Sequence, residues 1–527
     1  MSFYTLLELK SFSIFPEYFI GISLLYILFV LVLISYSVFG LIVQKPVSEC
    51  ISIILLLSCY LIINDSLIVN NLSIGFYSIA CFYKSITIDY FGELNKFLVC
   101  FFSSLYFFII SDFLKEYKLT ALEYLVILMF AVLGLVLLCT SNDLLTAYLS
   151  IELISLSSYI LAIFKKTSSF SVEAGIKYLV TDAISSAFFL LGSSFLYAFT
   201  GSIYIIDFTW IIWFWEESLF IGNNDNMPEL YIEVGLTLIL FSIFIKLAIA
   251  PFHLWSLDVY EGSPSISTFF FAVITKLSFF VFLVRICYTA AVYYQAFWKF
   301  YSISLGFLSI LIGSFGGLKQ KKLKTLLAYS SISHMGYCLL AFGASTSFGV
   351  EMLIFYLIIY MLAGLSIWFV VLSTRLNNKC YQNKFNKELG DLILLRRSNP
   401  GLAFSLALVM FSIAGIPPLV GFIAKLGVFL SILHVEYYIA AVFAILCTII
   451  STFYYIRVIK VLYFERSLSG KLYYPIVTNK TILFSFFILL LIFFFINPTF
   501  LYLIIHKTVW CSLFCTTSHY NEMFYFQ

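Results

Sequence analysis

Four lysines lie inside long apolar stretches of the chain, where a charged side chain is costly. They are Lys177, Lys246, Lys276 and Lys425. A carboxylate, Glu152, lies in another such stretch, and Glu173 precedes one of the lysines by four residues. An ionised side chain near the centre of a membrane helix costs at least ~2.5–3.5 kcal/mol. Such side chains persist where they are paired, hydrated or used, so their positions predict a functional site.

Proton transfer is the chemistry that these groups support. Burial favours the neutral form of a lysine, and a nearby carboxylate favours its charged form. We therefore expect Glu152 to pair with Lys246 and to control whether this lysine holds a proton. Lys276 and Lys425 would continue the relay along the membrane plane.

Three further residues are candidates for which a structural role stays open. Glu173 and Lys177 have the i,i+4 spacing of a simple ion pair on one helix face. His334 lies among hydroxyl groups in LLAYSSISHMGY (326–337), which suits a water-assisted relay. A lone buried histidine is more often a hydrogen-bonded structural residue. Asp182, inside another apolar stretch, could be a satisfied polar contact and is not counted among the candidates.

Two of the lysine-bearing stretches are interrupted by helix breakers. These are Pro251 in FIKLAIAPFHLW (244–255), and Gly415, Pro417 and Pro418 in FSIAGIPPLVGFIAK (411–425). Proline removes a helix hydrogen bond and clashes with the preceding turn. A broken helix at membrane depth must face protein or water. Lys246 precedes its break and Lys425 follows its own, which is the pattern of two inverted repeats in a transporter.

The composition of the chain requires a membrane. Of its 527 residues, 62% are hydrophobic and 11% are charged, whereas an average soluble domain has about 25% charged residues. Long unbroken apolar runs, rather than short alternating strands, predict an all-α polytopic membrane protein. The eleven cysteines form no CxxC motif and no basic patch is dense. Iron–sulfur, zinc and nucleic-acid sites are therefore not expected.

Apolar runs of 18 or more residues predict about fourteen transmembrane helices, with the broken helices as the seventh and twelfth. Their approximate ranges are 18–43, 50–70, 96–114, 121–140, 144–164, 173–200, 231–256, 265–291, 301–318, 323–344, 350–373, 401–432, 437–463 and 480–504. Four regions follow. They are three N-terminal helices (1–117), a first five-helix repeat (118–292), a second, inverted repeat (293–465), and the last helix with its tail (466–527).

Lysine and arginine are unevenly distributed between the loops of this scheme. Twenty of the 30 basic residues lie in odd-numbered loops and six in even-numbered loops or at the termini. Loops rich in these residues stay on the cytoplasmic or matrix side. Both termini are therefore expected on the opposite side of the membrane.

Several stretches resemble the antiporter-like membrane subunits of respiratory complex I, the NADH:ubiquinone oxidoreductase. They are SNDLLTAYLSIELISLSSYILAIF (141–164), SVEAGIKYLVTDAISSAFFLLGSSFLYAFTGS (171–202), KLAIAPFHLWSLDVYEGSPSISTFFFAVITKLSFF (246–280), LLAYSSISHMGY (326–337) and FSIAGIPPLVGFIAKLGVF (411–429). Three kinds of such subunit exist, and PFHLW…DVYEGSP together with Lys425 resembles the subunit 2 kind. Leu257 departs from the pattern, because the family has a proline before DVYEG.

The resemblance implies specific roles for the buried charges. Glu152, Lys246, Lys276 and Lys425 match the proton-channel positions of the family. Lys177 and His334 match further polar positions of the hydrophilic axis. This chain would bind no cofactor or metal itself, and NADH, FMN, iron–sulfur clusters and ubiquinone would be bound by partner subunits.

The resemblance also implies the setting of the chain. We expect other membrane-arm subunits as partners, including neighbouring antiporter-like subunits, together with membrane lipid and no nucleic acid. The expected location is the mitochondrial inner membrane, with both termini facing the intermembrane space. Two alternatives stay open. The chain could be a free-standing cation/proton antiporter subunit, or a structural membrane-arm subunit that does not pump.

Overall fold

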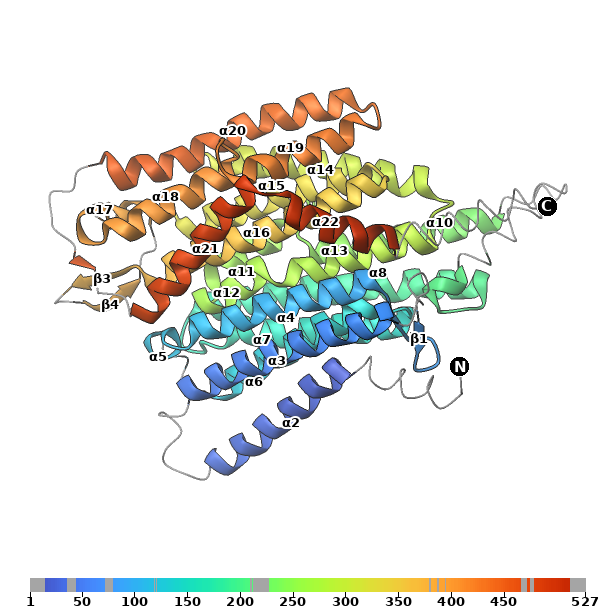
Figure 1. Cartoon of the computed structure of the whole chain (residues 1–527), viewed down its shortest axis with the longest axis horizontal. Helices are drawn as coiled ribbons and strands as arrows, with labels where there is room; N and C mark the ends of the chain where they lie inside the picture. Colours follow the sequence, from blue (N-terminus) through green and yellow to red (C-terminus); the bar gives the residue numbers. More distant parts are fainter. Residues whose placement is uncertain are drawn as a thin grey trace. The chain divides into compact units, whose positions relative to one another are not determined.

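The chain is an α-helical membrane protein (Figure 1). The computed structural model describes residues 15–35, 44–71, 79–117, 119, 121–208, 211, 227–378, 381–385, 388–393, 395–465, 472–473 and 478–511. Within these ranges nine helices are long and apolar enough to cross a membrane, or ten if a bent pair near the C-terminus forms one span. Fewer helices than the predicted fourteen pass this test, partly because Pro16–Val30, Pro400–Ala414 and Val420–Leu433 are shorter apolar helices.

The chain divides into two compact units, of which the first comprises Met1–Leu247, Ile274–Trp298 and His506–Gln527. Its helices include α2 (Phe15–Ser35), α3 (Gln44–Asn71), α4 (Tyr90–Ile110), α5 (Phe113–Glu116), α6 (Glu123–Thr140), α7 (Leu144–Ile163), α8 (Ser169–Thr200), α10 (Met227–Lys246) and α13 (Thr275–Arg285). A π-helical turn, η1 (Ile286–Ala290), follows α13. Strands β1 (Ile79–Cys81) and β2 (Ile86–Ile88) form an antiparallel hairpin in which Ala80 pairs with Thr87.

Close helix packing in the first unit brings α8 against α10. Gly192 on α8 faces Gly235 on α10, and a Cβ on Gly192 would lie 2.7 Å from the carbonyl oxygen of Gly235. Small residues let membrane helices approach closely in this way. The same contact places polar side chains of α8 beside the last turn of α10.

The start of α4 differs from the predicted third span. The sequence analysis counts Lys96 and Arg285 on the outer side of the membrane, near the ends of their spans, but both side chains are buried. The helix starts six residues earlier than Lys96, at Tyr90, because the Asp89 carboxylate caps it by accepting a hydrogen bond from the Gly92 amide at 3.1 Å. Arg285 pairs with the same carboxylate at 2.8 Å.

The second unit comprises Ala248–Val273 and Lys299–Ile505. Its helices are α11 (Leu254–Gly262), α12 (Ser265–Val273), most of α14 (Gln295–Gly317), α15 (Leu323–Gly343), α16 (Ser347–Ser373), α17 (Leu395–Ser398), α18 (Pro400–Ala414), α19 (Val420–Leu433), α20 (Tyr438–Tyr463), α21 (Thr478–Ile496) and most of α22 (Thr499–Val509), with the 3-10 turn η2 (Leu389–Leu392). A small antiparallel sheet has the order β4 (Tyr381–Phe385), β3 (Arg375–Asn378), β5 (Leu472–Tyr473). In it, Leu376 pairs with Lys384 and with Tyr473.

Helix breaks occur beside the two lysines next to predicted breakers. α10 ends at Lys246, Ala248 has a φ of 57°, and α11 begins at Leu254. α18 ends at Ala414, Gly415 has a φ of 84°, and α19 begins at Val420. Each break leaves backbone carbonyls at a helix end without an intrahelical donor.

One bend is absent from the sequence prediction. The predicted span 265–291 is confirmed as the membrane span Ser265–Ala290, in which Ile274 separates α12 from α13. The predicted last span, 480–504, is not straight, because α21 and α22 meet at an angle of 79°. Asn497 and Pro498 lie at this bend, where proline cannot continue the helical hydrogen bonding.

Candidate functional site: two buried lysines at helix breaks

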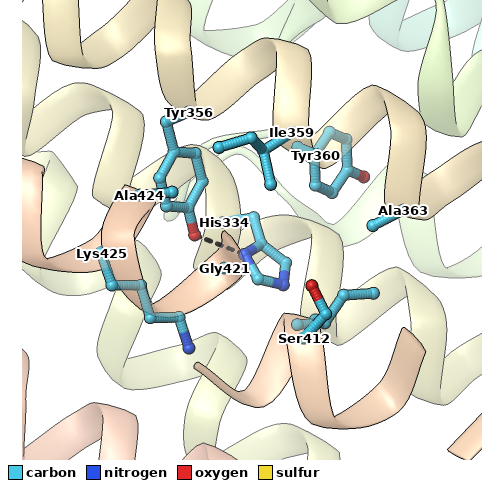
Figure 2. Close-up of a pocket in the computed structure, with 10 residues that line it drawn as sticks. His334, Tyr356, Ile359, Tyr360, Ala363, Ser412, Gly421, Ala424 and Lys425 are labelled. Carbon is cyan, nitrogen blue, oxygen red and sulfur yellow. Dashed lines mark hydrogen bonds between the residues drawn. The ribbon is translucent and has the colours of Figure 1, made fainter. Parts of the chain in front are cut away.

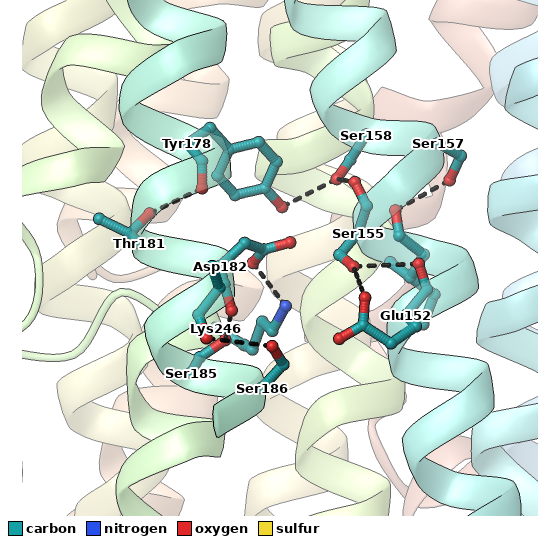
Figure 3. Close-up of polar contacts among 12 residues, drawn as sticks. Glu152, Ser155, Ser157, Ser158, Tyr178, Thr181, Asp182, Ser185, Ser186 and Lys246 are labelled. Carbon is teal, nitrogen blue, oxygen red and sulfur yellow. Dashed lines mark hydrogen bonds and ion pairs between the residues drawn. The ribbon is translucent and has the colours of Figure 1, made fainter. Parts of the chain in front are cut away.

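Lys246 forms a buried ion pair with Asp182 (Figure 3). Its Nζ lies 2.5 Å from Oδ1 of Asp182 on α8, and the two side chains are 5% and 8% exposed. The expectation that Glu152 is the direct partner of Lys246 is therefore wrong, because Asp182 is the carboxylate that pairs with this lysine. The reason is packing, since α8 lies against α10 and carries Asp182 to the lysine.

Glu152 reaches the same region through a tyrosine. Its carboxylate on α7 accepts a hydrogen bond from the Ser155 hydroxyl at 3.3 Å, and it interacts electrostatically with Tyr148 one turn earlier. Tyr148 and Lys246 line one small cavity. The full lining is Tyr148, Ile151, Ser185, Ser186, Phe189, Ser242, Ile243 and Lys246. Glu152 thus interacts with a tyrosine that lines the same cavity as Lys246.

Glu173 and Lys177 form the i,i+4 ion pair that their spacing predicts. Oε1 of Glu173 lies 2.7 Å from Nζ of Lys177, with side chains 60% and 44% exposed. Both belong to α8, which is among the least buried of the membrane helices described. This pair therefore lies on an outer face of the first unit.

Lys276 is buried, with 4% of its surface exposed. It lies in the first turn of α13, two residues after Ile274, where the helical pattern of the membrane span Ser265–Ala290 is irregular.

Lys425 is held at the end of a broken helix in the second unit (Figure 2). Its Nζ donates to the carbonyl oxygen of Ala414, the last residue of α18, at 2.8 Å. The ammonium also lies 5.5 Å from the ring centroid of Tyr337, within the range of a cation–π contact. A cation at a helix C-terminus is favoured by the helix dipole, so the break itself supplies the binding position for this lysine.

Lys425 and His334 face one cavity (Figure 2). The cavity is small, and its lining is His334, Tyr356, Ile359, Tyr360, Ala363, Ser412, Ile413, Gly421, Ala424 and Lys425. His334 Nδ1 lies 2.6 Å from the Tyr356 hydroxyl, and Nε2 lies 3.1 Å from the Tyr455 hydroxyl. The Tyr454 hydroxyl donates to that of Tyr455 at 3.3 Å. A hydrogen-bonded network of His334 and tyrosine hydroxyls therefore begins at the cavity that Lys425 lines.

The sequence analysis did not identify the tyrosines of this hydrogen-bonded network, although each lies within a predicted apolar span. Tyr356 is on α16 and Tyr455 is on α20. In a sequence with 37 tyrosines and 60 phenylalanines, no spacing rule distinguishes these from residues that only pack. Tyrosine needs a hydrogen-bond partner when it is buried, but the partner becomes visible only in the fold.

Gly415 is required by both its backbone conformation and its contact with Lys425. Its φ of 84° is left-handed, and a Cβ there would lie 2.8 Å from Cδ of Lys425. We expect Gly415→Ala to lower the free energy of unfolding by about 1–2 kcal/mol and to displace the lysine. Thermal unfolding of the protein solubilised from its membrane measures the effect. Gly401→Ala is the matched control, since a Cβ at Gly401 meets nothing within 4 Å; equal effects of the two substitutions would contradict the prediction.

The family of the chain follows from its relatives. Residues 141–451 match the family described as NADH:quinone oxidoreductase/Mrp antiporter, transmembrane. NADH-ubiquinone oxidoreductase chain 2 from Marchantia polymorpha is 36% identical over 402 residues, which are 76% of this chain and 79% of that protein. The chain belongs to the NADH:quinone oxidoreductase/Mrp antiporter membrane family.

Within this family, the similarity is to chain 2 and to its bacterial counterpart. NADH-quinone oxidoreductase subunit N from Pelagibacter ubique is 33% identical over 434 residues, covering 80% of this chain and 88% of that protein. The resemblance to the subunit 2 kind that the motifs predict is therefore confirmed.

Solved structures share the fold. A chain of respiratory complex I from Thermus thermophilus aligns with a TM-score of 0.71 and 23% identity, covering 92% of this chain and 98% of that chain. A chain of the Mrp complex from a Dietzia species aligns with a TM-score of 0.77 and 18% identity, covering 96% and 98%. The whole helical architecture, not just the matched central region, is thus common to these proteins.

Proposed function

We propose that this chain is a proton-translocating membrane-arm subunit of an NADH:quinone oxidoreductase. Electron transfer from NADH to quinone takes place in partner subunits, which bind NADH, FMN, iron–sulfur clusters and quinone, and it drives proton movement here. The names of the relatives support the oxidoreductase part. The observation that carries the proton part is that Lys246 and Lys425 are buried at helix breaks and that each lines a small cavity.

In the first unit, Lys246 holds a proton while Asp182 is beside it. An ammonium and a carboxylate stabilise each other in a buried site. Separating them, or placing a proton on Asp182, releases the Lys246 proton into the cavity beside Tyr148. Glu152, which interacts electrostatically with Tyr148, changes the local charge and so biases this step.

In the second unit, the described contacts of Lys425 are neutral. They are the Ala414 carbonyl and the Tyr337 ring. A proton that leaves Nζ enters the cavity shared with His334, whose neutral ring can accept at one nitrogen and donate at the other. The hydroxyls of Tyr356 and Tyr455 contact these nitrogens and offer the onward path.

The remaining relay and the architecture belong to the same proposal. Lys276 would transfer protons between these two lysines, and Glu173 with Lys177 would adjust the charge near the entrance. Fourteen membrane helices would be arranged as three N-terminal helices (1–117), two inverted repeats (118–292 and 293–465) and a last helix with its tail (466–527). The opposite positions of Lys246 and Lys425 relative to their breaks support the inversion.

The membrane setting completes the proposal. We place the chain in the mitochondrial inner membrane, with both termini on the intermembrane-space side, as the distribution of lysine and arginine indicates. The relative from Marchantia polymorpha, whose name specifies ubiquinone, supports this location. Partners would be other membrane-arm subunits, including antiporter-like neighbours, and lipid. Helices such as α8 and α20, with large apolar surfaces exposed in the isolated chain, offer faces for both.

A free-standing cation/proton antiporter subunit is the second candidate. The family description includes the Mrp antiporter, and the Dietzia chain shares the fold. In that case ion exchange would proceed without NADH, whereas the proposed subunit would depend on electron transfer.

A native gel of mildly solubilised membranes, stained for NADH dehydrogenase activity, separates these candidates. Mass spectrometry of the active band is expected to find this chain in a large NADH-oxidising complex. Its presence in a small, inactive band alone would contradict the oxidoreductase proposal and favour the antiporter.

A further inference from the structure

A second group of buried charges lies among the N-terminal helices of the first unit, which are drawn in blue in Figure 1. Nζ of Lys96 on α4 lies 2.7 Å from Oε1 of Glu17 on α2 and 2.6 Å from Oε1 of Glu93 on α4. The side chain of Lys96 is 0% exposed, and those of the glutamates are 6% and 7% exposed. Asp65 on α3 interacts electrostatically with Lys96 and Glu17. We call these four residues the Lys96 cluster.

The charges of the Lys96 cluster do not balance. Fully ionised, its three carboxylates exceed its one ammonium by two negative charges. The helices packed against α4 supply little compensation. α6 contributes the thiol Cys139, and α13 contributes Arg285, which is already paired with Asp89. Carboxylates that share a buried site cannot all stay ionised without a counter-charge.

The hydrogen bonding of the Lys96 cluster shows the same shortage. Oε2 of Glu17, Oε2 of Glu93 and Oδ2 of Asp65 are buried and accept no hydrogen bond from the described part of the chain. Buried ionised oxygens normally have donors. A proton on a carboxyl group removes charge and converts one such oxygen into a donor for a neighbouring carboxylate. Protonation of one carboxylate therefore reduces the excess negative charge of the cluster and also supplies one of the missing hydrogen-bond donors.

We propose that Glu17, Asp65 and Glu93 around Lys96 form a proton-holding site, separate from the relay through Lys246 and Lys425. The three residues come from three helices, α2, α3 and α4, so the site depends on how these helices pack. Glu93 is the expected carrier, because both of its oxygens are buried and it shares Lys96 with Glu17. The proposal goes beyond the relay and does not depend on it, because its readout is proton occupancy rather than turnover.

Infrared difference spectroscopy of the intact solubilised assembly tests the site. At neutral pH, the spectrum of the wild-type protein minus that of Glu93→Gln is expected to show the carbonyl stretch of a protonated carboxylic acid, which shifts in heavy water. Glu261→Gln is the matched control, since this glutamate is exposed and paired with Lys322, and its substitution should leave the band unchanged. Asp65→Asn, at the half-buried edge of the cluster, is the second variant in case Glu93→Gln does not assemble.

The result that overturns the proposal is equally specific. Loss of the band in Glu93→Gln or Asp65→Asn, with retention in Glu261→Gln, supports a held proton. Identical carboxylic-acid bands in the wild type and both cluster variants would overturn it. A cluster band that appears only when sodium and potassium are removed would also overturn it, because the site would then hold a metal cation under ordinary conditions.

Discussion

Replacing Lys425 with methionine is expected to lower NADH-driven quinone turnover about tenfold, which corresponds to ~1.4 kcal/mol in the activation barrier. Methionine preserves most of the apolar stem but removes the group that holds the proton. The cavity with His334 remains, but residue 425 can no longer hold a proton. Assembly should persist, because the lost hydrogen bond to the Ala414 carbonyl is worth only about 1 kcal/mol.

The measurement is quinone reduction together with proton uptake in sealed vesicles, normalised to the amount of assembled complex. Lys460→Met is the matched control, since Lys460 is exposed in the last turn of α20. A Lys425→Met enzyme with the turnover and proton-to-electron ratio of the Lys460→Met enzyme would show that no proton passes through Lys425.

The positions of the buried lysines were predictable because local rules determine them. Charge inside an apolar run is costly wherever the run packs, and proline or glycine breaks a helix whatever its neighbours. Lys246 and Lys425 could thus be singled out, and the helix ends observed at Lys246 and Ala414 lie beside predicted breakers. The capping of Ala414 by Lys425 follows from the same local geometry, because a break exposes carbonyls close to the lysine.

The partners of these lysines depend on packing, which no local rule gives. Glu152 and Asp182 both lie in apolar spans and both are carboxylates, so sequence alone cannot choose which of them meets Lys246. The close approach of α8 and α10 at Gly192 and Gly235 brings Asp182, rather than Glu152, next to Lys246. The Lys96 cluster was missed for a related reason. The sequence places Lys96 at a span edge, whereas the cap by Asp89 extends α4 and carries the lysine into the buried region.

Replacing Asp182 with asparagine is expected to destabilise the assembled protein by about 3–5 kcal/mol. The substitution leaves the Lys246 ammonium buried without its counter-ion, and breaking one side of a buried ion pair costs this much. The double variant Asp182→Asn, Lys246→Met removes the whole pair. Its stability should return close to that of the wild type, since removing a buried pair completely is often near neutral. Thermal unfolding of the complex and its yield on native gels measure both variants.

Glu152→Gln distinguishes the two carboxylates in this experiment. Its contacts are Ser155 and Tyr148 rather than the ammonium, so we expect a stability loss well below that of Asp182→Asn and no rescue by Lys246→Met. Stronger coupling of Lys246 to Glu152 than to Asp182 in the two double-mutant cycles would overturn the observed pairing. The rescued double variant also separates stability from function. It should assemble and still lose coupled turnover, because no group at the break of α10 then exchanges a proton with the cavity beside Tyr148.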